Sequence, residues 1–318
     1  ANVSPLGLPE GVARAITAAL PTADRYPDPL CRELRAKLAL HEGVPAAQIL
    51  CGNGAADLIF RLVWARKPRR ALVTAPTFAE YATALESIGC TVERFFLREQ
   101  EVCAAIRPGV DMVFLCQPNN PTGQLTALPL VEQVLRRCAA CGTLLVVDEC
   151  FLDFLPDHAL HTAKGLLGEG DLVILKAFTK LYGMAGVRLG YALSADTALL
   201  EQMQACGQPW GVSSLAQAAG LAALEETAYV EKVRALIAEQ RPRLTAGLRA
   251  LGLRVLDGRA NYLLFQAPET LGEALRQRGA VLRSCANYPG LGPGWYRTAV
   301  RTGPENEQLL KLLAEVLE

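Results

Sequence analysis

The sequence predicts an α/β protein with a mostly parallel sheet, followed by a smaller α+β unit. From about residue 50 to residue 205, short apolar runs alternate with stretches of helical periodicity, as in chains that wind helices around a parallel sheet. Polar or glycine-rich segments follow several of these runs directly, at the position where open sheets of this kind bind ligands. After residue 205 longer helical stretches replace the alternation, which predicts the second unit.

Six apolar runs in the first part are expected to be strands. The stretch 128–141 carries apolar residues at helical spacing, and Gly142 ends it before the next apolar run. The predicted strands are 71–74, 92–96, 112–116, 143–147, 172–176 and 188–193, and the predicted helices between them include 55–65, 78–88 and 127–141.

The C-terminal third predicts a different arrangement. A long helical region over about 213–250 precedes strand-like segments and a closing helix. The strand-like segments are 254–256, 261–265, 280–284 and 296–302, with a helix near 270–278. We expect a large domain at 27–205 and a small domain made of 1–26 and 206–318.

Charge and composition exclude several classes of function. The 318 residues carry 32 basic and 32 acidic side chains, so no global field favours nucleic acid or an anionic membrane. No apolar run has the length of a membrane span, and the first residues lack the layout of a signal peptide, so we expect a cytoplasmic protein. The ten cysteines are scattered, and the lone CxxC at 138–141 has few histidines to join it. Neither a disulfide framework nor a metal site is expected.

The most informative segment is 178–188, FTKLYGMAGVR. It places Lys180 directly after the hydroxyl of Thr179 and eight residues before Arg188. A lysine amine forms an imine with an aldehyde cofactor, and a hydroxyl with a guanidinium can hold that cofactor's phosphate. A lysine and an arginine at this spacing are common, so the spacing alone does not establish a cofactor site. Two segments that precede it in the sequence strengthen the prediction, PNNPTG at 118–123 and VVDE at 146–149.

Asp148 ends a run that is expected to be a buried strand, and Asn120 lies in a turn sequence after the run 112–116. Alone, each has an ordinary structural interpretation as a turn residue. Together with Lys180 they resemble the pyridoxal 5′-phosphate (PLP) enzymes of the aspartate aminotransferase fold, fold type I. The resemblance implies that Lys180 holds PLP, that Asp148 keeps the pyridine nitrogen protonated and that Asn120 faces the phenolic oxygen.

A phosphate-binding site is also expected. The segment 52–57, GNGAAD, opens a predicted helix, and the free N–H groups at a helix N-terminus bind phosphate well. The expected donors are the backbone amides of Ala55 and Ala56, with Thr179 and Arg188 completing the site. Neither alanine has a side-chain donor, so the prediction depends on the backbone.

The resemblance assigns roles to two aromatic residues. Phe78 begins the helix after the run 71–74, and the resemblance implies that it stacks on the pyridine ring; the alternative is a core phenylalanine. Tyr26 lies in an Arg-Tyr-Pro segment, where the resemblance implies contact with the PLP phosphate of a neighbouring subunit. The chain is therefore expected to be a homodimer with shared active sites, although a surface turn remains the alternative for Tyr26.

The resemblance covers the whole chain and narrows to the threonine-phosphate decarboxylases of cobalamin biosynthesis, within the histidinol-phosphate aminotransferase branch. The passages that carry it are 2–7, 67–70, 78–81, 258–264, 283–291, 296–297 and 300–301. It implies that Asn2, Asn120, Arg283 and Arg297 contact a small phosphorylated amino acid, whose anionic groups suit arginine. The implied reaction is PLP-dependent decarboxylation of O-phospho-L-threonine to (R)-1-aminopropan-2-yl phosphate.

Three alternatives stay open. A histidinol-phosphate aminotransferase would use the same residues, with room for an imidazole and for 2-oxoglutarate. O-phospho-L-serine differs from O-phospho-L-threonine by one methyl, which is worth only about 1–3 kcal/mol in a pocket. A PLP-fold binding module without turnover would predict the loss of Lys180 or Asp148, and both are present. The resemblance also implies a substrate contact from a His-Gly pair in a segment that precedes residue 1. No residue of this sequence is assigned to that contact.

Overall fold

Seven strands form the larger of two sheets in the computed structural model, which describes residues 2–96 and 102–317. Their order is β1-β7-β6-β5-β4-β2-β3. The neighbours from β6 to β3 are parallel, whereas β7 runs antiparallel to both β6 and β1. The strands are β1 (Ile49–Gly52), β2 (Arg70–Ala75), β3 (Thr91–Phe96), β4 (Met112–Cys116), β5 (Leu144–Asp148), β6 (Leu172–Ala177) and β7 (Gly190–Leu193). The predicted mostly parallel sheet is confirmed.

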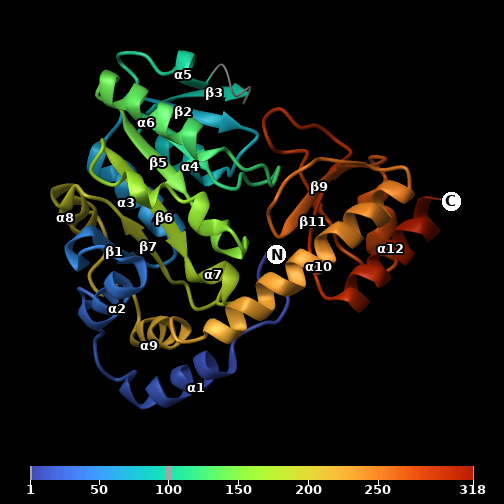
Figure 1. Ribbon diagram of the computed structural model, residues 1–318, viewed down its shortest axis with the longest axis horizontal. Coiled ribbons are helices and arrows are strands. Elements are labelled where there is room, and N and C mark those ends of the chain that lie inside the picture. The colour runs from blue at the N-terminus through green and yellow to red at the C-terminus, as the bar shows by residue number, and fades with distance from the viewer. Residues whose placement is uncertain (1, 97–101, 318) are drawn as a thin grey trace.

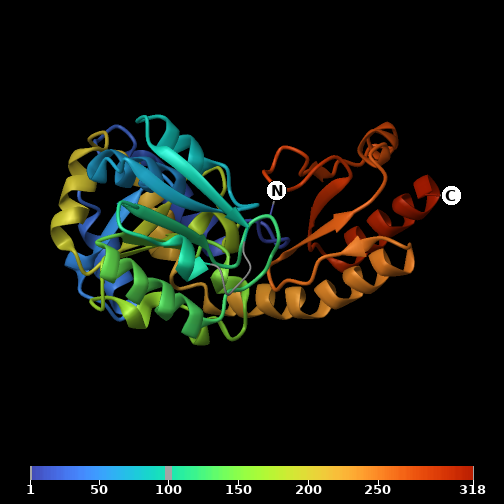
Figure 2. The ribbon, with the colours of Figure 1, turned by 90° about the horizontal axis from the view of Figure 1, so that it is seen from above.

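Both faces of this sheet are covered by helices, as Figures 1 and 2 show. In β5, Leu144 and Val146 pack against one group of helices and Leu145 and Val147 against the other, as the two-residue period of a strand requires. On the first face lie α3 (Ala55–Arg66), α4 (Glu80–Glu86) and α8 (Thr197–Ala205); on the second lie α2 (Arg32–Glu42), α5 (Val102–Ala105) and α6 (Leu128–Cys141).

A second, antiparallel sheet has the order β10-β11-β9-β8 and packs with the C-terminal helices. The long helix α10 extends from the large sheet to the second one, and the N-terminus lies between the two (Figures 1 and 2). The elements are α9 (Ser214–Ala223), α10 (Thr227–Ala250), β8 (Arg254–Val255), β9 (Tyr262–Gln266), α11 (Leu271–Gln277), β10 (Arg283–Ser284), β11 (Trp295–Ala299) and α12 (Gly303–Leu317). The domain boundaries at 26/27 and 205/206 stay a prediction.

Some elements differ from the expected ones. The predicted helical region 213–250 is two helices, α9 and α10, separated by residues 224–226. Strand β1, helix α1 (Glu10–Ala19) and helix α2 are not among the predicted elements. Helix α1 packs against α9, and α9 packs against α2. These three helices therefore form one layer, and its contacts join segments that are distant in sequence. No helix among the described residues has the length and apolar character needed to cross a bilayer.

The N-terminal segment lies directly on the short helix α7 (Phe178–Leu181), which carries Lys180. The backbone N–H of Ser4 donates to the carbonyl of Lys180 at 2.8 Å, and the hydroxyl of Tyr229 in α10 donates to Ser4 Oγ at 2.7 Å. Gly183 has a φ of +61°, and a Cβ there would lie 2.5 Å from the carbonyl oxygen of Gly7. The close approach of the two segments therefore depends on glycine at 183.

A buried ionic cluster lies behind the carboxyl end of β6. Lys176 Nζ is 3.3 Å from Glu42 Oε1 and 3.1 Å from Asp153 Oδ1, while Tyr191 donates its hydroxyl to Glu42 and Lys164 pairs with it. Burial alone would raise the pKa of Glu42, but Lys176, Tyr191 and Lys164 lower it to about 2. The cluster ties α2 to the large sheet and satisfies the charge of Lys176.

Removing one charge from this cluster should destabilise the fold. We expect Lys176→Met to lower the free energy of unfolding by about 3 kcal/mol, because Glu42 then keeps a buried charge with fewer partners and half-buried Asp153 also loses its partner. Arg14→Met is the control, since Arg14 pairs with Glu10 on the surface and should cost less than about 1 kcal/mol. Urea denaturation measures both, and equal losses would contradict the structural role of Lys176.

Candidate active site

A cavity of about 380 Å³ lies at the carboxyl edge of the large sheet, where the second unit and the N-terminal segment meet it. Parallel strands place such a cavity where their carboxyl ends converge. Its lining residues are Asn2, Ala55, Ala56, Phe78, Cys116, Asn120, Asp148, Cys150, Phe151, Ala177, Thr179, Lys180, Arg188, Arg283, Tyr288 and Arg297.

Lys180 lies on the short helix α7 (Phe178–Leu181), which follows β6 directly. Its Nζ is 5.7 Å from the centre of the Phe151 ring. Burial lowers the pKa of Lys180; Cys150 and Asp148 act against that shift, and Arg188 and Arg297 act with it. A larger fraction of neutral amine is therefore present than for an exposed lysine, which favours nucleophilic attack on a carbonyl.

Asp148 is the last residue of β5 and is buried. Its Oδ2 accepts a hydrogen bond from the hydroxyl of Tyr81 at 2.5 Å, and its Oδ1 accepts one from the backbone N–H of Cys150 at 2.9 Å. The alternation of the strand directs Glu149 to the other face, where its carboxyl accepts from Thr162 Oγ1 and from the Ala163 N–H. Burial raises the pKa of Glu149 to about 7. Of the two adjacent acids, Asp148 lines the cavity and Glu149 does not.

The N-terminus of α3 forms one end of the cavity. Ala55 and Ala56 begin this helix, so their backbone N–H groups are available to a ligand. Gly54 has a φ of +83°, and a Cβ there would lie 2.8 Å from Arg188 Nη2. Arg188 therefore lies across the helix N-terminus, where its guanidinium and the N–H groups can bind the same anion.

The opposite end of the cavity is formed by the second unit and the N-terminal segment. An Arg297 N–H donates to the side-chain oxygen of Asn120, and the Arg297 guanidinium lies 5.4 Å from the ring centre of Tyr262. Arg297 Nε and Asn2 Nδ2 are buried without a hydrogen-bond partner in the described part of the chain. Buried donors without partners are costly, so these two suit a ligand that brings acceptors. Arg283 is exposed at the same end.

The charge of the lining is strongly positive. Lys180, Arg188, Arg283 and Arg297 contribute four cationic side chains, and Asp148 contributes the one carboxylate of the lining. The cations lie at both ends of the cavity, so the lining is suited to a ligand, or a pair of ligands, with anionic groups at both ends.

The structure brings together eleven of the twelve predicted site residues and leaves one outside. Asn2, Ala55, Ala56, Phe78, Asn120, Asp148, Thr179, Lys180, Arg188, Arg283 and Arg297 all line the cavity. Tyr26 lies on the surface, 78% exposed, with its ring stacked on Trp210 at 4.4 Å between ring centres. The roles assigned to these residues stay predictions.

Several lining residues were not predicted. Cys116 ends β4, Cys150 and Phe151 follow Asp148, and Tyr288 lies in the passage 283–291. The first three could have been found from position alone, because residues at or just after the carboxyl ends of parallel strands face the same edge. Lys176, the second lysine near this edge, lies in the ionic cluster.

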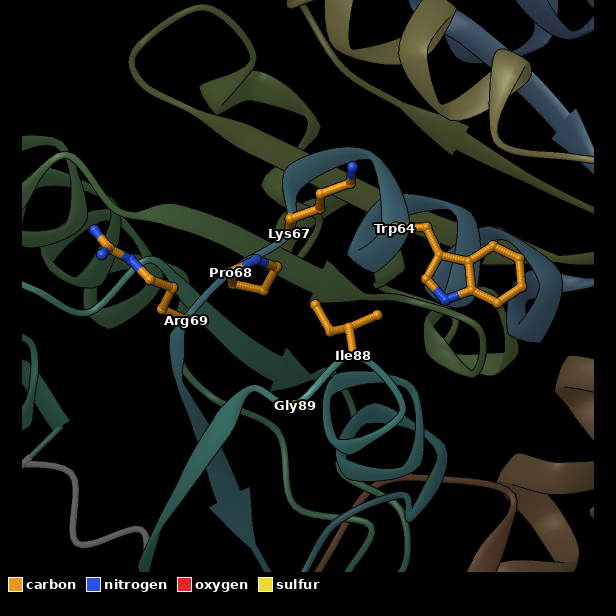
Figure 3. Close-up of a pocket in the computed structure, with 6 residues that line it drawn as sticks. All are labelled: Trp64, Lys67, Pro68, Arg69, Ile88 and Gly89. Atoms are coloured by element: carbon orange, nitrogen blue, oxygen red, sulfur yellow. The ribbon is translucent and has the colours of Figure 1, made fainter.

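Another hollow, of about 600 Å³, lies between the end of α3 and the turn before β3. Figure 3 shows that the charged ends of Lys67 and Arg69 point away from each other there, with Pro68 between them, Trp64 beyond Lys67, and Ile88 and Gly89 below. Convergent polar groups mark a binding site, so this hollow is the weaker candidate. No group of three metal-ligating side chains occurs among residues 2–96 and 102–317.

Comparison with known proteins agrees with this geometry. The model of the family "Aminotransferase class I and II" matches residues 1–316. The chain belongs to this family. Threonine-phosphate decarboxylase of Salmonella typhimurium is 39% identical over 100% of this chain and 90% of its own length. Histidinol-phosphate aminotransferase of Symbiobacterium thermophilum is 35% identical over 99% and 89%.

A solved structure of the same family is similar throughout. Histidinol-phosphate aminotransferase from Sinorhizobium meliloti, in complex with pyridoxal-5′-phosphate, has a TM-score of 0.85 and 25% identity, covering 100% of this chain and 89% of that one. The predicted aminotransferase fold is therefore confirmed.

Proposed function

We propose that this chain is a PLP-dependent decarboxylase that converts O-phospho-L-threonine to (R)-1-aminopropan-2-yl phosphate. The observation that carries the proposal is one cavity in which Lys180 and Asp148 lie between an anion-binding helix N-terminus and a second group of arginines. The 39% identity to a threonine-phosphate decarboxylase over the whole chain supports the choice of substrate.

The residues of the cavity fit PLP. Its aldehyde requires an amine, its pyridine nitrogen a carboxylate and its phosphate a set of donors. Lys180 is the lysine among the lining residues, and Asp148 is the lining carboxylate. The N–H groups of Ala55 and Ala56, with Thr179 and Arg188, supply the phosphate donors, and Phe78 lies where it can cover the ring. A relative's structure in complex with pyridoxal-5′-phosphate supports the same cofactor here.

When bound, PLP supplies an electron sink for the bond that breaks at the substrate Cα. Asp148 holds a proton at the pyridine nitrogen, which a buried carboxylate with two fixed donors does well. The ammonium form of Lys180, made more acidic by the burial that lowers its pKa, would donate the proton that replaces the lost carboxylate at Cα. These two residues therefore carry the proton movements of the reaction.

Arg297, Arg283, Asn2 and Asn120 bind and orient the substrate. The buried, unpartnered N–H groups of Arg297 and Asn2 would donate hydrogen bonds to the oxygens of a carboxylate or phosphate. Orientation decides the reaction, because the electron sink of the cofactor would act on whichever Cα bond the site presents to it. The arginines would have to present the bond to the carboxylate for decarboxylation, whereas transamination would require them to present the Cα–H bond.

Histidinol-phosphate aminotransferase is the second candidate, because a relative of that name is 35% identical to the chain. It would use the same lysine, aspartate and phosphate donors. The identity to this aminotransferase, 35%, is lower than the 39% identity to the threonine-phosphate decarboxylase, which favours the decarboxylase. O-phospho-L-serine remains a third substrate, since one methyl contributes little discrimination.

We also propose a cytoplasmic homodimer that supplies an aminopropanol phosphate for cobalamin biosynthesis. The exposed pair Tyr26 and Trp210 supports an interface, because Tyr26 lies outside its own cavity and is free to reach a neighbouring one. Aromatic side chains of this kind are enriched in interfaces. Sedimentation at micromolar concentration tests the dimer, and a monomer there would contradict it.

Carbon dioxide release tests the reaction directly. With O-phospho-L-threonine and no keto acid, the PLP-loaded protein should release carbon dioxide with steady turnover, and Lys180→Ala should lose nearly all of this activity because it lacks the proton donor. Release measured with radiolabelled carboxyl carbon gives the rate. Formation of glutamate from histidinol phosphate and 2-oxoglutarate, without release, would favour the aminotransferase.

Truncation of Arg297 should weaken substrate use more than truncation of a nearby surface arginine. We expect Arg297→Met to lower kcat/KM at least about 30-fold, because a desolvated guanidinium contributes roughly 2–5 kcal/mol to binding an anion. Arg301→Met is the matched control, since Arg301 pairs with Glu305 on the surface at 2.7 Å and should change kcat/KM by less than threefold, or about 0.6 kcal/mol. Equal effects of the two changes would contradict substrate binding by Arg297.

A further inference from the structure

One tyrosine of α4 contacts the carboxylate of the cavity without lining the cavity itself. The hydroxyl of Tyr81 donates to Asp148 Oδ2 at 2.5 Å, and the Tyr81 side chain is fully buried. The backbone N–H of Cys150 holds the other oxygen, Oδ1. Each oxygen of Asp148 therefore has one fixed donor, the Tyr81 hydroxyl for Oδ2 and the Cys150 backbone N–H for Oδ1.

The ring of Tyr81 is held independently of its hydroxyl. It stacks on Phe114 of β4, with ring centres 4.8 Å apart and an interplanar angle of 16°, and it meets Phe78 edge-on at 5.5 Å and 83°. Phe78 lines the cavity, and Tyr81, three residues later, lies behind it. Loss of the hydroxyl would therefore leave the aromatic packing in place.

We propose that Tyr81 is a positioning residue for Asp148: its hydroxyl orients the carboxylate and stabilises the charged form of that carboxylate toward the pyridine nitrogen of PLP. The inference rests on the proposed function, because it requires PLP in the cavity. A donor to a buried carboxylate stabilises its charge, so the pair of carboxylate and protonated pyridine is favoured over the neutral pair. The ring of the cofactor then keeps its positive charge.

The other ionisable groups around Asp148 do not replace this donor. Cys116 at the end of β4, Cys150 beside Asp148 and Tyr262 of β9 are buried, and burial raises the pKa of each. These three groups therefore stay neutral, as does Tyr81, whose pKa burial and Asp148 also raise. Lys180 lies close enough for Asp148 to oppose the lowering of its pKa, and in the proposed function its nitrogen is bound to the cofactor.

The test compares two buried tyrosines. Tyr191 of β7 also donates its hydroxyl to a buried carboxylate at 2.5 Å, that of Glu42, but it does not line the cavity or contact a lining residue's carboxylate. Tyr81→Phe and Tyr191→Phe therefore remove the same kind of hydrogen bond, one at the proposed cofactor site and one away from it. Loss of stability in urea should be similar for the two.

Two readouts distinguish positioning from stability. In PLP titrations of the apoprotein, Tyr81→Phe should raise the Kd about tenfold, because hydrogen bonds to charged groups are the stronger ones. In pH titrations of the visible band of the lysine-bound cofactor, its midpoint should rise by about one unit. With less positive charge in the ring, the lysine nitrogen holds its proton more tightly. Tyr191→Phe should leave both values as in the wild type.

Each outcome decides the matter. Wild-type values of Kd and midpoint for Tyr81→Phe would overturn the inference while the proposed function stands. A wild-type protein that forms no lysine-bound chromophore with PLP would instead overturn the proposed function, and this inference with it. If Tyr81→Phe does not fold, 3-fluorotyrosine at position 81 is the second test: its more acidic hydroxyl should lower the midpoint, and an unchanged midpoint would overturn the inference.

Discussion

A buried carboxylate at the end of the central strand β5 is the constraint on which the site depends. Asp148 is removed from water, and an ionised group there is stable only when donors replace its hydration. Tyr81 and the N–H of Cys150 supply two of these donors, and they leave the rest of the carboxylate to the cavity. The neighbouring strands β4 and β6 end at the same edge, so Asn120 and Lys180 follow them into the same space.

The large sheet alone makes only half of the cavity. Its strands and helices supply the lysine, the aspartate and the helix N-terminus, whereas the arginines of the second sheet supply the cations at the other end. Register brings those arginines together, since Arg283 of β10 is paired with Arg297 of β11. The N-terminal segment adds Asn2 to the lining, and the backbone N–H of Ser4 donates to the carbonyl of Lys180 on α7. The site thus joins three parts of the chain that are distant in sequence.

Much of the fold could be predicted, because the period of the apolar residues reflects burial on one or both sides of a strand. That pattern located strands β2 to β7, and the residues after them became site candidates through their position at the carboxyl edge. Helix α2 mixes charged and apolar residues in a way that hides its buried side, Leu34 and Leu38. The substrate arginines came from family resemblance, since nothing in local pattern distinguishes Arg297 from Arg301.

Contacts between distant segments set the limit of such prediction. The hydrogen bond from Tyr81 to Asp148 joins residues 67 positions apart and depends on how α4 lies across the sheet. The separate environments of Asp148 and Glu149, and of Lys176 and Lys180, likewise follow from the direction in which each strand or turn presents its side chains. Neighbouring residues of the same type therefore have different functions here, which composition and spacing do not reveal.

The central claim is that the cavity binds PLP through Lys180, and peptide mapping after borohydride reduction tests it most directly. Reduction of the PLP-loaded protein fixes the cofactor on the lysine that carries it, and mass spectrometry of the digested protein identifies that lysine. The account predicts the added mass on the peptide that contains Lys180, at Lys180 itself. A reduced adduct on Lys176, or no lysine adduct in PLP-saturated protein, would contradict it.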